Sequence, residues 1–190
     1  MVNGKRCGWL NLKNPVYVKY HDEEWGVLQR DDGALYELFL LECFQAGLSW
    51  ECVLNKRESF RAAFDGFDIE KVCAYGEDRI SELMNNGGII RNRMKIRAAV
   101  RNSAVFREIQ REYGSFYGYI CSFTEGRIIY EEYTRRTFSP LSDTVSADLK
   151  RRGMSFVGSV TVYSFLQAAG FISAHSRDCI CYRGGFSEST

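Results

Sequence analysis

The chain has 190 residues, 45% of them hydrophobic, and its 25 Lys and Arg residues nearly balance its 24 Asp and Glu residues. This length and apolar share are sufficient for a substantial core, which excludes a disordered chain. We therefore expect one domain over residues 1–190, or two closely packed helical lobes. Because the net charge is close to zero, any nucleic-acid surface must come from a local cluster of cations.

The cysteine count and the absence of long apolar runs bear on the compartment. Seven cysteines, an odd number, are scattered along a chain that is too long for a disulfide-stapled miniprotein, which indicates a reducing environment. The first residues lack the apolar core of a signal peptide, and no run of about 18 apolar residues is present to span a membrane. We expect a cytoplasmic protein with no membrane partner, and a monomer by default.

Apolar residues recur at helical spacing along most of the chain, which predicts an all-α fold of about eight or nine helices. After an irregular start, the predicted helices run from Asp31 or Asp32 to Gly47, from Ser49 to Gly66, from Asp68 to about Gly76, from Glu77 to about Asn85, from Arg91 to Tyr113, from Ser142 or Asp143 to Gly153, and from Gly158 to Ala169, before a last helix around His175. The segment 125–139 is interpreted as a loop or a short extended piece.

Both histidines of the chain lie near a cysteine. Cys7 precedes His21 near one end, and His175 precedes Cys179 by four residues near the other end. Thiolate and neutral imidazole ligands suit tetrahedral Zn²⁺, and four protein ligands leave no open position for a reacting water. We predict one structural Zn²⁺ that joins the two ends of the chain. The alternative is that these pairs are coincidental, and the thiol of Cys181 leaves open which sulfur binds.

A glycine pair lies directly before the longest predicted helix, whose start is basic. Unpaired backbone amides at a helix N-terminus attract phosphate, and glycine lets another backbone approach closely. We therefore predict that the glycine pair forms a hairpin between two helices, and that this hairpin contacts the DNA backbone without reading its sequence. The predicted contacts are Gly87, Gly88, Ile90, Arg91, Arg93 and Lys95. The alternative is an ordinary turn between helices, followed by a solvated basic turn.

Glu42 stands in the apolar end of a predicted helix. Burial alone would neutralise a carboxylate, so we expect Glu42 to accept hydrogen bonds or to face a cationic ligand. Five aromatic residues are close to it in sequence: Trp9, Tyr17, Tyr20, Trp25 and Trp50. Aromatic faces and a carboxylate together suit a planar cationic ring. The alternative is that the aromatic residues form core and that Glu42 pairs with an Arg or Lys.

Over nearly its whole length the sequence resembles the 3-methyladenine DNA glycosylase I family, a branch of the helix-hairpin-helix base-excision glycosylases. The resemblance rests on Arg6-Cys7-Gly8-Trp9, Tyr20-His21-Asp22-Glu23-Glu24-Trp25-Gly26-Val27, the run from Glu42 to Trp50, Gly88-Ile89-Ile90-Arg91, Arg152-Gly153-Met154-Ser155-Phe156-Val157-Gly158, and His175 with Cys179. It implies excision of 3-methyladenine from alkylated double-stranded DNA, with an abasic site and the free base as products. It also implies that the same four Cys and His residues bind a structural zinc, and that Glu42, Tyr20 and Trp50 form the base pocket.

The mechanism implied by this resemblance has one unusual feature. Many glycosylases of the wider superfamily carry an aspartate some twenty residues beyond the hairpin, whereas the first aspartate after Arg91 is Asp143. We therefore expect Glu42 to recognise and electrostatically stabilise a base that already leaves readily, with Leu48 or Gln45 as wedge candidates beside the flipped nucleotide. The alternatives are a catalytically inactive helix-hairpin-helix DNA-binding protein and an oxidoreductase or metal sensor built on the Cys and His residues.

Overall fold

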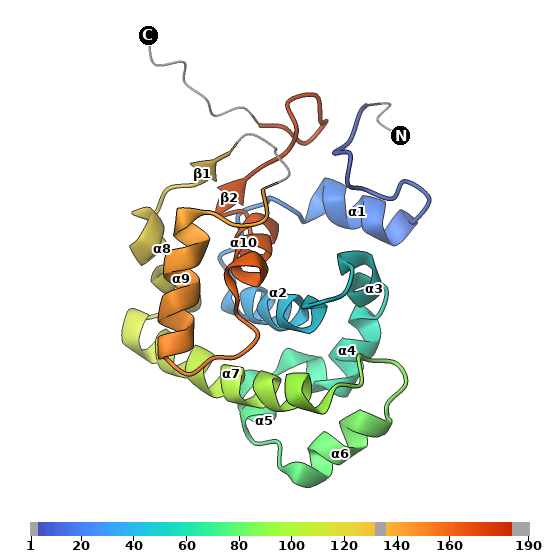
Figure 1. Ribbon diagram of the computed structural model, residues 1–190, viewed down its shortest axis with the longest axis vertical. Coiled ribbons are helices and arrows are strands. Elements are labelled where there is room, and N and C mark those ends of the chain that lie inside the picture. Colours follow the sequence, from blue (N-terminus) through green and yellow to red (C-terminus); the bar gives the residue numbers. More distant parts are fainter. Residues whose placement is uncertain (1–3, 132–135, 184–190) are drawn as a thin grey trace.

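The computed structural model describes residues 4–131 and 136–183, and within them the chain forms ten α-helices and two short strands (Figure 1). The helices are α1 (Pro15–Glu23), α2 (Asp32–Gln45), α3 (Trp50–Leu54), α4 (Arg57–Ala63), α5 (Ile69–Cys73), α6 (Glu77–Asn85), α7 (Arg93–Tyr113), α8 (Phe116–Thr124), α9 (Pro140–Arg151) and α10 (Ser159–Ala168). A single 3-10 turn, Asp65–Phe67, follows α4. The strands β1 (Ile129–Tyr130) and β2 (Ile172–Ser173) pair in parallel. The helical fold is thus confirmed, with a small two-stranded addition.

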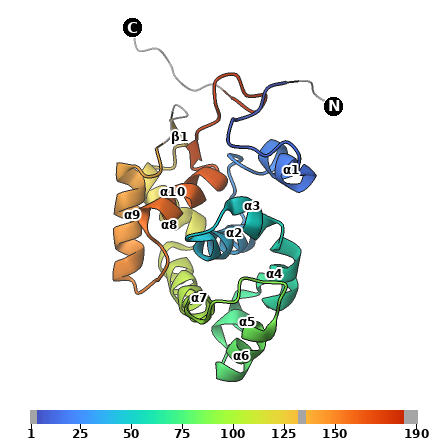
Figure 2. The same ribbon diagram turned by 45° about the vertical axis from the view of Figure 1, so that its right-hand side comes forward.

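Helix α2 lies at the centre of the structure. Its N-terminus is capped by Asp31, whose side chain accepts from the amide of Ala34 at 2.8 Å. Nine of its residues are buried, and it packs against α3, α7, α8 and α10 (Figures 1 and 2). A helix that is apolar on all sides is typical of a core position. Glu42 near its end is therefore carried by a rigid, buried element.

Helix α1 forms in the segment that we expected to be irregular. The side chain of Asn14 accepts from the amides of Val16 and Tyr17, and Pro15 occupies the first helical position, where its missing N–H has no cost. Its buried residues are Tyr17, Tyr20 and His21. The helix thus places two pocket candidates and one metal-ligand candidate on one element.

Several predicted boundaries differ from the structure, most clearly those around α3, α4 and α9. The single helix expected between Ser49 and Gly66 is divided into α3 and α4, because α3 ends at its C-cap Asn55. The cap of α9 lies three or four residues before the predicted cap at Ser142 or Asp143: Ser139 caps the helix in a reciprocal capping box with Ser142. The segment 125–139 contains β1, and residues 132–135 lie outside the described residues.

The helix expected around His175 is not formed. His175 follows β2 in irregular chain, and Cys179 lies in a turn in which its amide donates to the carbonyl of Ser176 at 2.8 Å. The amide of Ile180 donates to the carbonyl of Lys5 at 2.9 Å, so the segments from the two ends of the chain lie side by side (Figure 1). None of the described helices combines the length and apolar character that crossing a membrane requires.

Candidate active site and metal centre

The predicted aromatic residues and Glu42 meet around one cavity. The cavity has a volume of about 360 Å³, within the range of roughly 300–1,000 Å³ that small-molecule sites occupy. Its lining residues are Trp9, Tyr17, Tyr20, Trp25, Glu42, Gln45, Trp50, Arg136, Thr137, Ser164 and Gln167. One wall is therefore aromatic with a single carboxylate, and the other is polar.

Two buried polar atoms at this cavity lack a partner. Glu42 is 3% exposed, and its Oε2 has no hydrogen bond among the described residues. The indole Nε1 of Trp50, also buried, has none either. Burial raises the pKa of Glu42 well above its usual value. An unpaired acceptor and an unpaired donor at one cavity are the arrangement expected where a ligand supplies the missing hydrogen bonds.

The aromatic rings form a tilted set around the cavity. The centroids of Tyr20 and Trp50 lie 5.4 Å apart, and Trp9 lies 5.4 Å from Tyr17 and 5.0 Å from Trp25. Burial and the nearby Glu42 raise the pKa of Tyr20 well above its usual value, and burial with nearby carboxylates raises that of Tyr17 to about 12. Both phenols are therefore neutral at physiological pH. They offer O–H donors and flat faces to a ligand.

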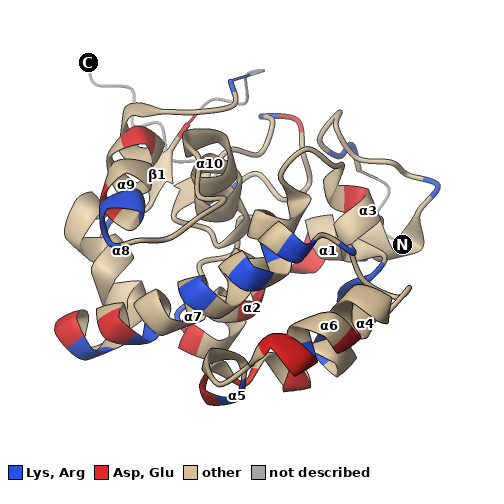
Figure 3. Cartoon of the chain, turned by 60° about the horizontal axis from the view of Figure 1, so that its bottom comes forward, with Lys and Arg blue, Asp and Glu red and all other residues tan. Residues whose placement is uncertain are grey.

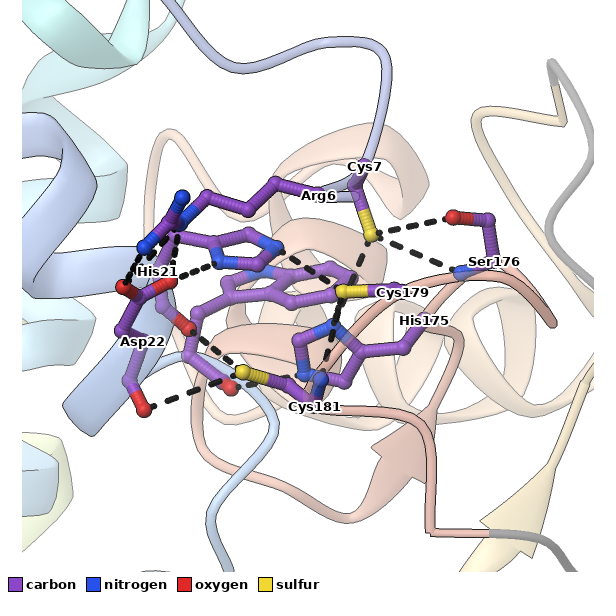
Figure 4. A network of polar contacts seen from close by, with 9 residues as sticks. Arg6, Cys7, His21, Asp22, His175, Ser176, Cys179 and Cys181 are labelled. Carbon is purple, nitrogen blue, oxygen red and sulfur yellow. Dashed lines mark hydrogen bonds and ion pairs between the residues drawn. The ribbon is translucent and has the colours of Figure 1, made fainter. Parts of the chain in front are cut away.

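Cys7, His21, His175 and Cys179 form a buried cluster whose ligand atoms all lie within 4.8 Å of one another (Figure 4). Three of the S–N separations, Cys7 to His175, Cys179 to His21 and Cys179 to His175, are 3.5 Å. A tetrahedral zinc with bonds of about 2.3 Å to sulfur and 2.05 Å to nitrogen has S–N edges of about 3.6 Å. The cluster can therefore bind one metal ion, and its spacing fits zinc.

The second nitrogen of each imidazole has its own partner. Nδ1 of His21 lies 2.8 Å from Oδ1 of Asp22, and Arg6 donates to both oxygens of that carboxylate (Figure 4). Nε2 of His175 lies 3.2 Å from the carbonyl oxygen of Trp25. Such partners fix the tautomer and the ring orientation of metal-binding histidines. Both rings thus direct an acceptor nitrogen into the cluster.

The two thiols of the cluster are likewise held by backbone amides, and Cys181 lies beside the cluster, in a second group of possible metal ligands with His21 and Asp22. The amide of Ser176 donates to Sγ of Cys7, and the amide of Cys181 donates to Sγ of Cys179, both at 3.4 Å. Without a metal, burial raises the pKa of the Cys7 thiol to about 11, so thiolate character requires a cation. Sγ of Cys181 lies 3.8–3.9 Å from the carbonyls of His21 and Asp22, outside the four-residue cluster.

Two tryptophans are shared between the cluster and the cavity. Trp9 lies 5.3 Å from the ring of His21, and Trp25 lies 4.5 Å from that of His175. At Gly26, next to Trp25, φ is +77° and an added Cβ would lie 3.0 Å from Nε2 of His175. The aromatic wall of the cavity is therefore packed directly on the Cys and His residues.

The predicted hairpin joins α6 to α7. Asn86 ends α6, and its side chain accepts from the amide of Gly88 at 2.8 Å. A Cβ at Gly88 would lie 3.1 Å from Ser59, so α4 approaches the hairpin closely. The side chain of Asn92 accepts from the amide of Lys95 and thereby caps α7 two residues later than the predicted start.

The hairpin cations differ in their exposure. Arg91 and Arg93 are exposed, Arg93 pairs with Glu77 at 3.2 Å, and Ile90 is half-buried. Cationic segments continue along α7 (Figure 3). Lys95, in contrast, is buried, and its ammonium donates to the carbonyls that end α2. The charge of Lys95 therefore faces inward, and this placement gives no support to the predicted contact of Lys95 with DNA.

Sequence reasoning missed the polar wall of the cavity. Ser164 and Gln167 come from α10, and Arg136 and Thr137 from the segment before α9. The α10 pair had a detectable signal, because Ser164 and Gln167 are three positions apart and therefore lie on one face of a largely apolar helix. Asp143 is exposed in the first turn of α9 and is not among the lining residues.

Comparisons with known proteins define the class of protein. A family model described as methyladenine glycosylase matches residues 9–182. The chain therefore belongs to the methyladenine glycosylase family.

The relatives have more specific names. The chain is 40% identical over 184 residues to DNA-3-methyladenine glycosylase 1 of Escherichia coli (strain K12), covering 95% of this chain and 98% of that protein. It is 37% identical over 180 residues to DNA-3-methyladenine glycosylase of Haemophilus influenzae, covering 93% and 97%. Its structure is similar, with a TM-score of 0.88 and 37% identity, to a variant of 3-methyladenine DNA glycosylase I solved in complex with 3-methyladenine, covering 92% of this chain and 96% of that one.

Proposed function

We propose that this protein is a monofunctional DNA-3-methyladenine glycosylase. It hydrolyses the N-glycosidic bond of 3-methyladenine in alkylated duplex DNA and leaves an abasic site and the free base. The observation that supports this most directly is the buried, unpaired Oε2 of Glu42 beside an aromatic cavity. One hydrophobic cluster extends from Cys7 to Cys179, so we also propose a single domain.

Recognition in this proposal follows from charge. Methylation at N3 makes adenine in DNA cationic, and Glu42 is the carboxylate that lines the cavity. The flipped ring stacks among Tyr20, Trp50 and Tyr17, with Trp9 and Trp25 completing the aromatic wall, while Glu42 accepts a hydrogen bond from the exocyclic amine. A carboxylate beside a cationic ring is favourable, because the buried anion then has the partner that it otherwise lacks.

Cleavage needs little further help from the protein. The methylated base departs as a neutral molecule, so the bond is weaker than that of normal adenine, and the positive charge moves to the sugar. Glu42 stays ionised near this developing charge and acts as an electrostatic catalyst. This role accords with the place of Asp143, which is exposed and not among the cavity residues.

DNA binding is assigned to the hairpin and to the turn after α2. Gly87, Gly88, Ile90, Arg91 and Arg93 contact phosphates through amides and side chains. Leu48, 41% exposed in the turn between α2 and α3, fills the gap that the flipped nucleotide leaves. Gln45 is the weaker wedge candidate, because it lines the cavity.

The metal in this proposal is one zinc with a structural role. Cys7, His21, His175 and Cys179 would hold it, and they leave no open position for a substrate. Zinc supplies stability to the two segments that meet there and performs no step of the reaction. The shared contacts of Trp9 and Trp25 extend this support to the cavity.

The test is to incubate the purified protein with methylated duplex DNA and to identify the released bases, with unmethylated duplex as the control. Release of free 3-methyladenine is the expected result. A protein that retains methylated DNA but releases no base is an inactive DNA-binding protein. A protein that responds to chelation with a reversible change in ligand binding and no loss of thermal stability is a metal sensor.

A further inference from the structure

Lys95 is a buried cation between two parts of the proposed site. It lies in the first turn of α7, is 7% exposed, and its Nζ donates to the carbonyls of Phe44 at 2.8 Å and Ala46 at 2.6 Å. The last carbonyls of a helix have no partner within the helix, and a cation there also stabilises the helix dipole. Lys95 therefore fixes the end of α2 against the start of α7.

Helix α7 also holds the loop before α10. The ammonium of Lys95 lies 5.9 Å from the ring centre of Phe156, whose φ of +59° is in the left-handed region. Two turns further along α7, Asn102 accepts from the amide of Ser155 and donates to its carbonyl, both at 2.9 Å. One helix therefore positions the end of α2, near Glu42, and the loop that leads to the polar wall.

The burial of the charged ammonium of Lys95 is unfavourable by itself, so another interaction must compensate it. Burial lowers the pKa of Lys95, because the charged form is poorly solvated there. A methionine of the same length would fill the space without that penalty but would leave the two carbonyls without their donor. The side chain is therefore suited to holding two backbone segments in one relative position, and not to filling space.

We propose that Lys95 is a positioning residue that sets the register between the DNA-binding hairpin and the base pocket. This inference rests on the proposed function. Arg91 and the hairpin amides hold phosphates, Lys95 follows one turn later, and its bonds fix the turn of α2 that ends beside Glu42 and leads to Leu48. A phosphate held at the hairpin thereby fixes where the flipped base meets the pocket.

The proposal predicts different effects on the affinity for free 3-methyladenine and on the rate of excision from DNA. A merely structural role of Lys95 would change both together. Free 3-methyladenine reaches the pocket without the hairpin, so its affinity does not depend on the register. Excision from DNA does depend on it, because a reacting group misplaced by about 1 Å costs on the order of 100-fold in rate. The salt dependence of DNA binding adds a third readout, since each phosphate contact that is lost lowers its slope by about 0.9.

The experiment compares Lys95→Met and Lys95→Gln with the wild-type protein and with Lys71→Met, a matched change at an exposed lysine on α5. Single-turnover release of 3-methyladenine from methylated duplex, affinity for free 3-methyladenine and the salt slope of duplex binding are measured. We expect both Lys95 variants to release the base about 10- to 100-fold more slowly. Free-base affinity and the salt slope stay at the wild-type values, and Lys71→Met behaves as wild type throughout.

Each other result overturns the inference. A wild-type excision rate in Lys95→Met shows that the register does not depend on the ammonium, and a salt slope lower by about one unit shows that Lys95 reaches DNA after all. Parallel loss of free-base affinity, or failure of both variants to fold, assigns Lys95 to general stability. A wild-type protein that releases no base overturns the proposed function itself, which distinguishes the two failures.

Discussion

Replacing Glu42 by glutamine tests the charge at the centre of the pocket. The substitution keeps the shape and one carbonyl acceptor but removes the negative charge. In the structure the side chain is 3% exposed and its Oε2 has no partner, so no other described group compensates the change. The effect of Glu42→Gln therefore measures what the ionised carboxylate contributes to binding a cationic base.

The magnitude follows from the strength of charged hydrogen bonds. A hydrogen bond to a charged group contributes about 1.5–3 kcal/mol, against about 1 kcal/mol between neutral groups. We therefore expect Glu42→Gln to weaken binding of the methylated nucleotide by about 0.5–2 kcal/mol, or about 2- to 30-fold. Two unit charges about 4 Å apart interact by about 4 kcal/mol at an effective dielectric of 20, which sets an upper bound.

The raised pKa of Glu42 adds a dependence on pH. The carboxylate attracts a cation only when ionised, so excision by the wild-type protein should rise with pH through the raised pKa. For the empty protein the sign is opposite: stability is complete below the ordinary value of 4.5 and falls as pH rises through the raised pKa. Glu42→Gln should therefore unfold at a higher temperature than wild type at pH 8, with a smaller difference towards acidic pH.

The assays are base release from methylated duplex, equilibrium binding to methylated duplex, and thermal unfolding at several pH values. Glu58→Gln is the matched control, since Glu58 is 81% exposed on α4 and is not among the residues that line the cavity. Wild-type excision and binding in Glu42→Gln would refute the electrostatic role. A Glu42→Gln protein that is less stable than wild type at pH 8 would refute the account of its burial.

Three further predictions concern the metal, the hairpin and the wedge. Cys179→Ser should lose bound zinc and unfold at a lower temperature, whereas Cys181→Ser should retain zinc, as measured by elemental analysis and calorimetry; equal loss in both would contradict the cluster as described. Arg91→Met should weaken binding to all duplexes alike and lower the salt slope by about 0.9, and an unchanged slope would remove Arg91 from the contacts. Leu48→Gly should slow excision from duplex DNA and leave free-base affinity unchanged; equal excision would assign the wedge elsewhere.

The helices that were predicted well from the sequence are those in which the capping residue and the apolar periodicity indicate the same element. Helix α2 has an aspartate cap followed by a long apolar run, and α6 and α7 show clear helical periodicity. The cluster was predictable because two rare residue types occur in pairs near both ends of the chain. The place of Glu42 at a buried site was predictable for a physical reason: a single carboxylate within an apolar run is costly to bury unless it has a polar or cationic partner.

What sequence did not predict depended on tertiary contacts. Lys95 looked like a surface cation because its neighbours Arg91 and Arg93 are exposed, but the face of α7 that meets α2 is set by packing. The spacing of His175 and Cys179 suggested a helix, whereas a turn after β2 brings them together. Both errors arose where the whole fold, and not the local pattern, decides the conformation.

The charge of Glu42 must carry the selection of damaged bases, because its hydrogen bond cannot. Normal adenine has the same exocyclic amine as 3-methyladenine, so both rings can donate a hydrogen bond to the unpaired Oε2. Only the methylated ring in DNA is cationic, and only the ionised carboxylate distinguishes it from a neutral ring of nearly equal shape. Glu42→Gln should therefore lose discrimination more than it loses affinity. An excess of undamaged duplex should compete more effectively against the glutamine variant than against the wild-type protein, and equal competition would place the selectivity in the shape of the cavity instead.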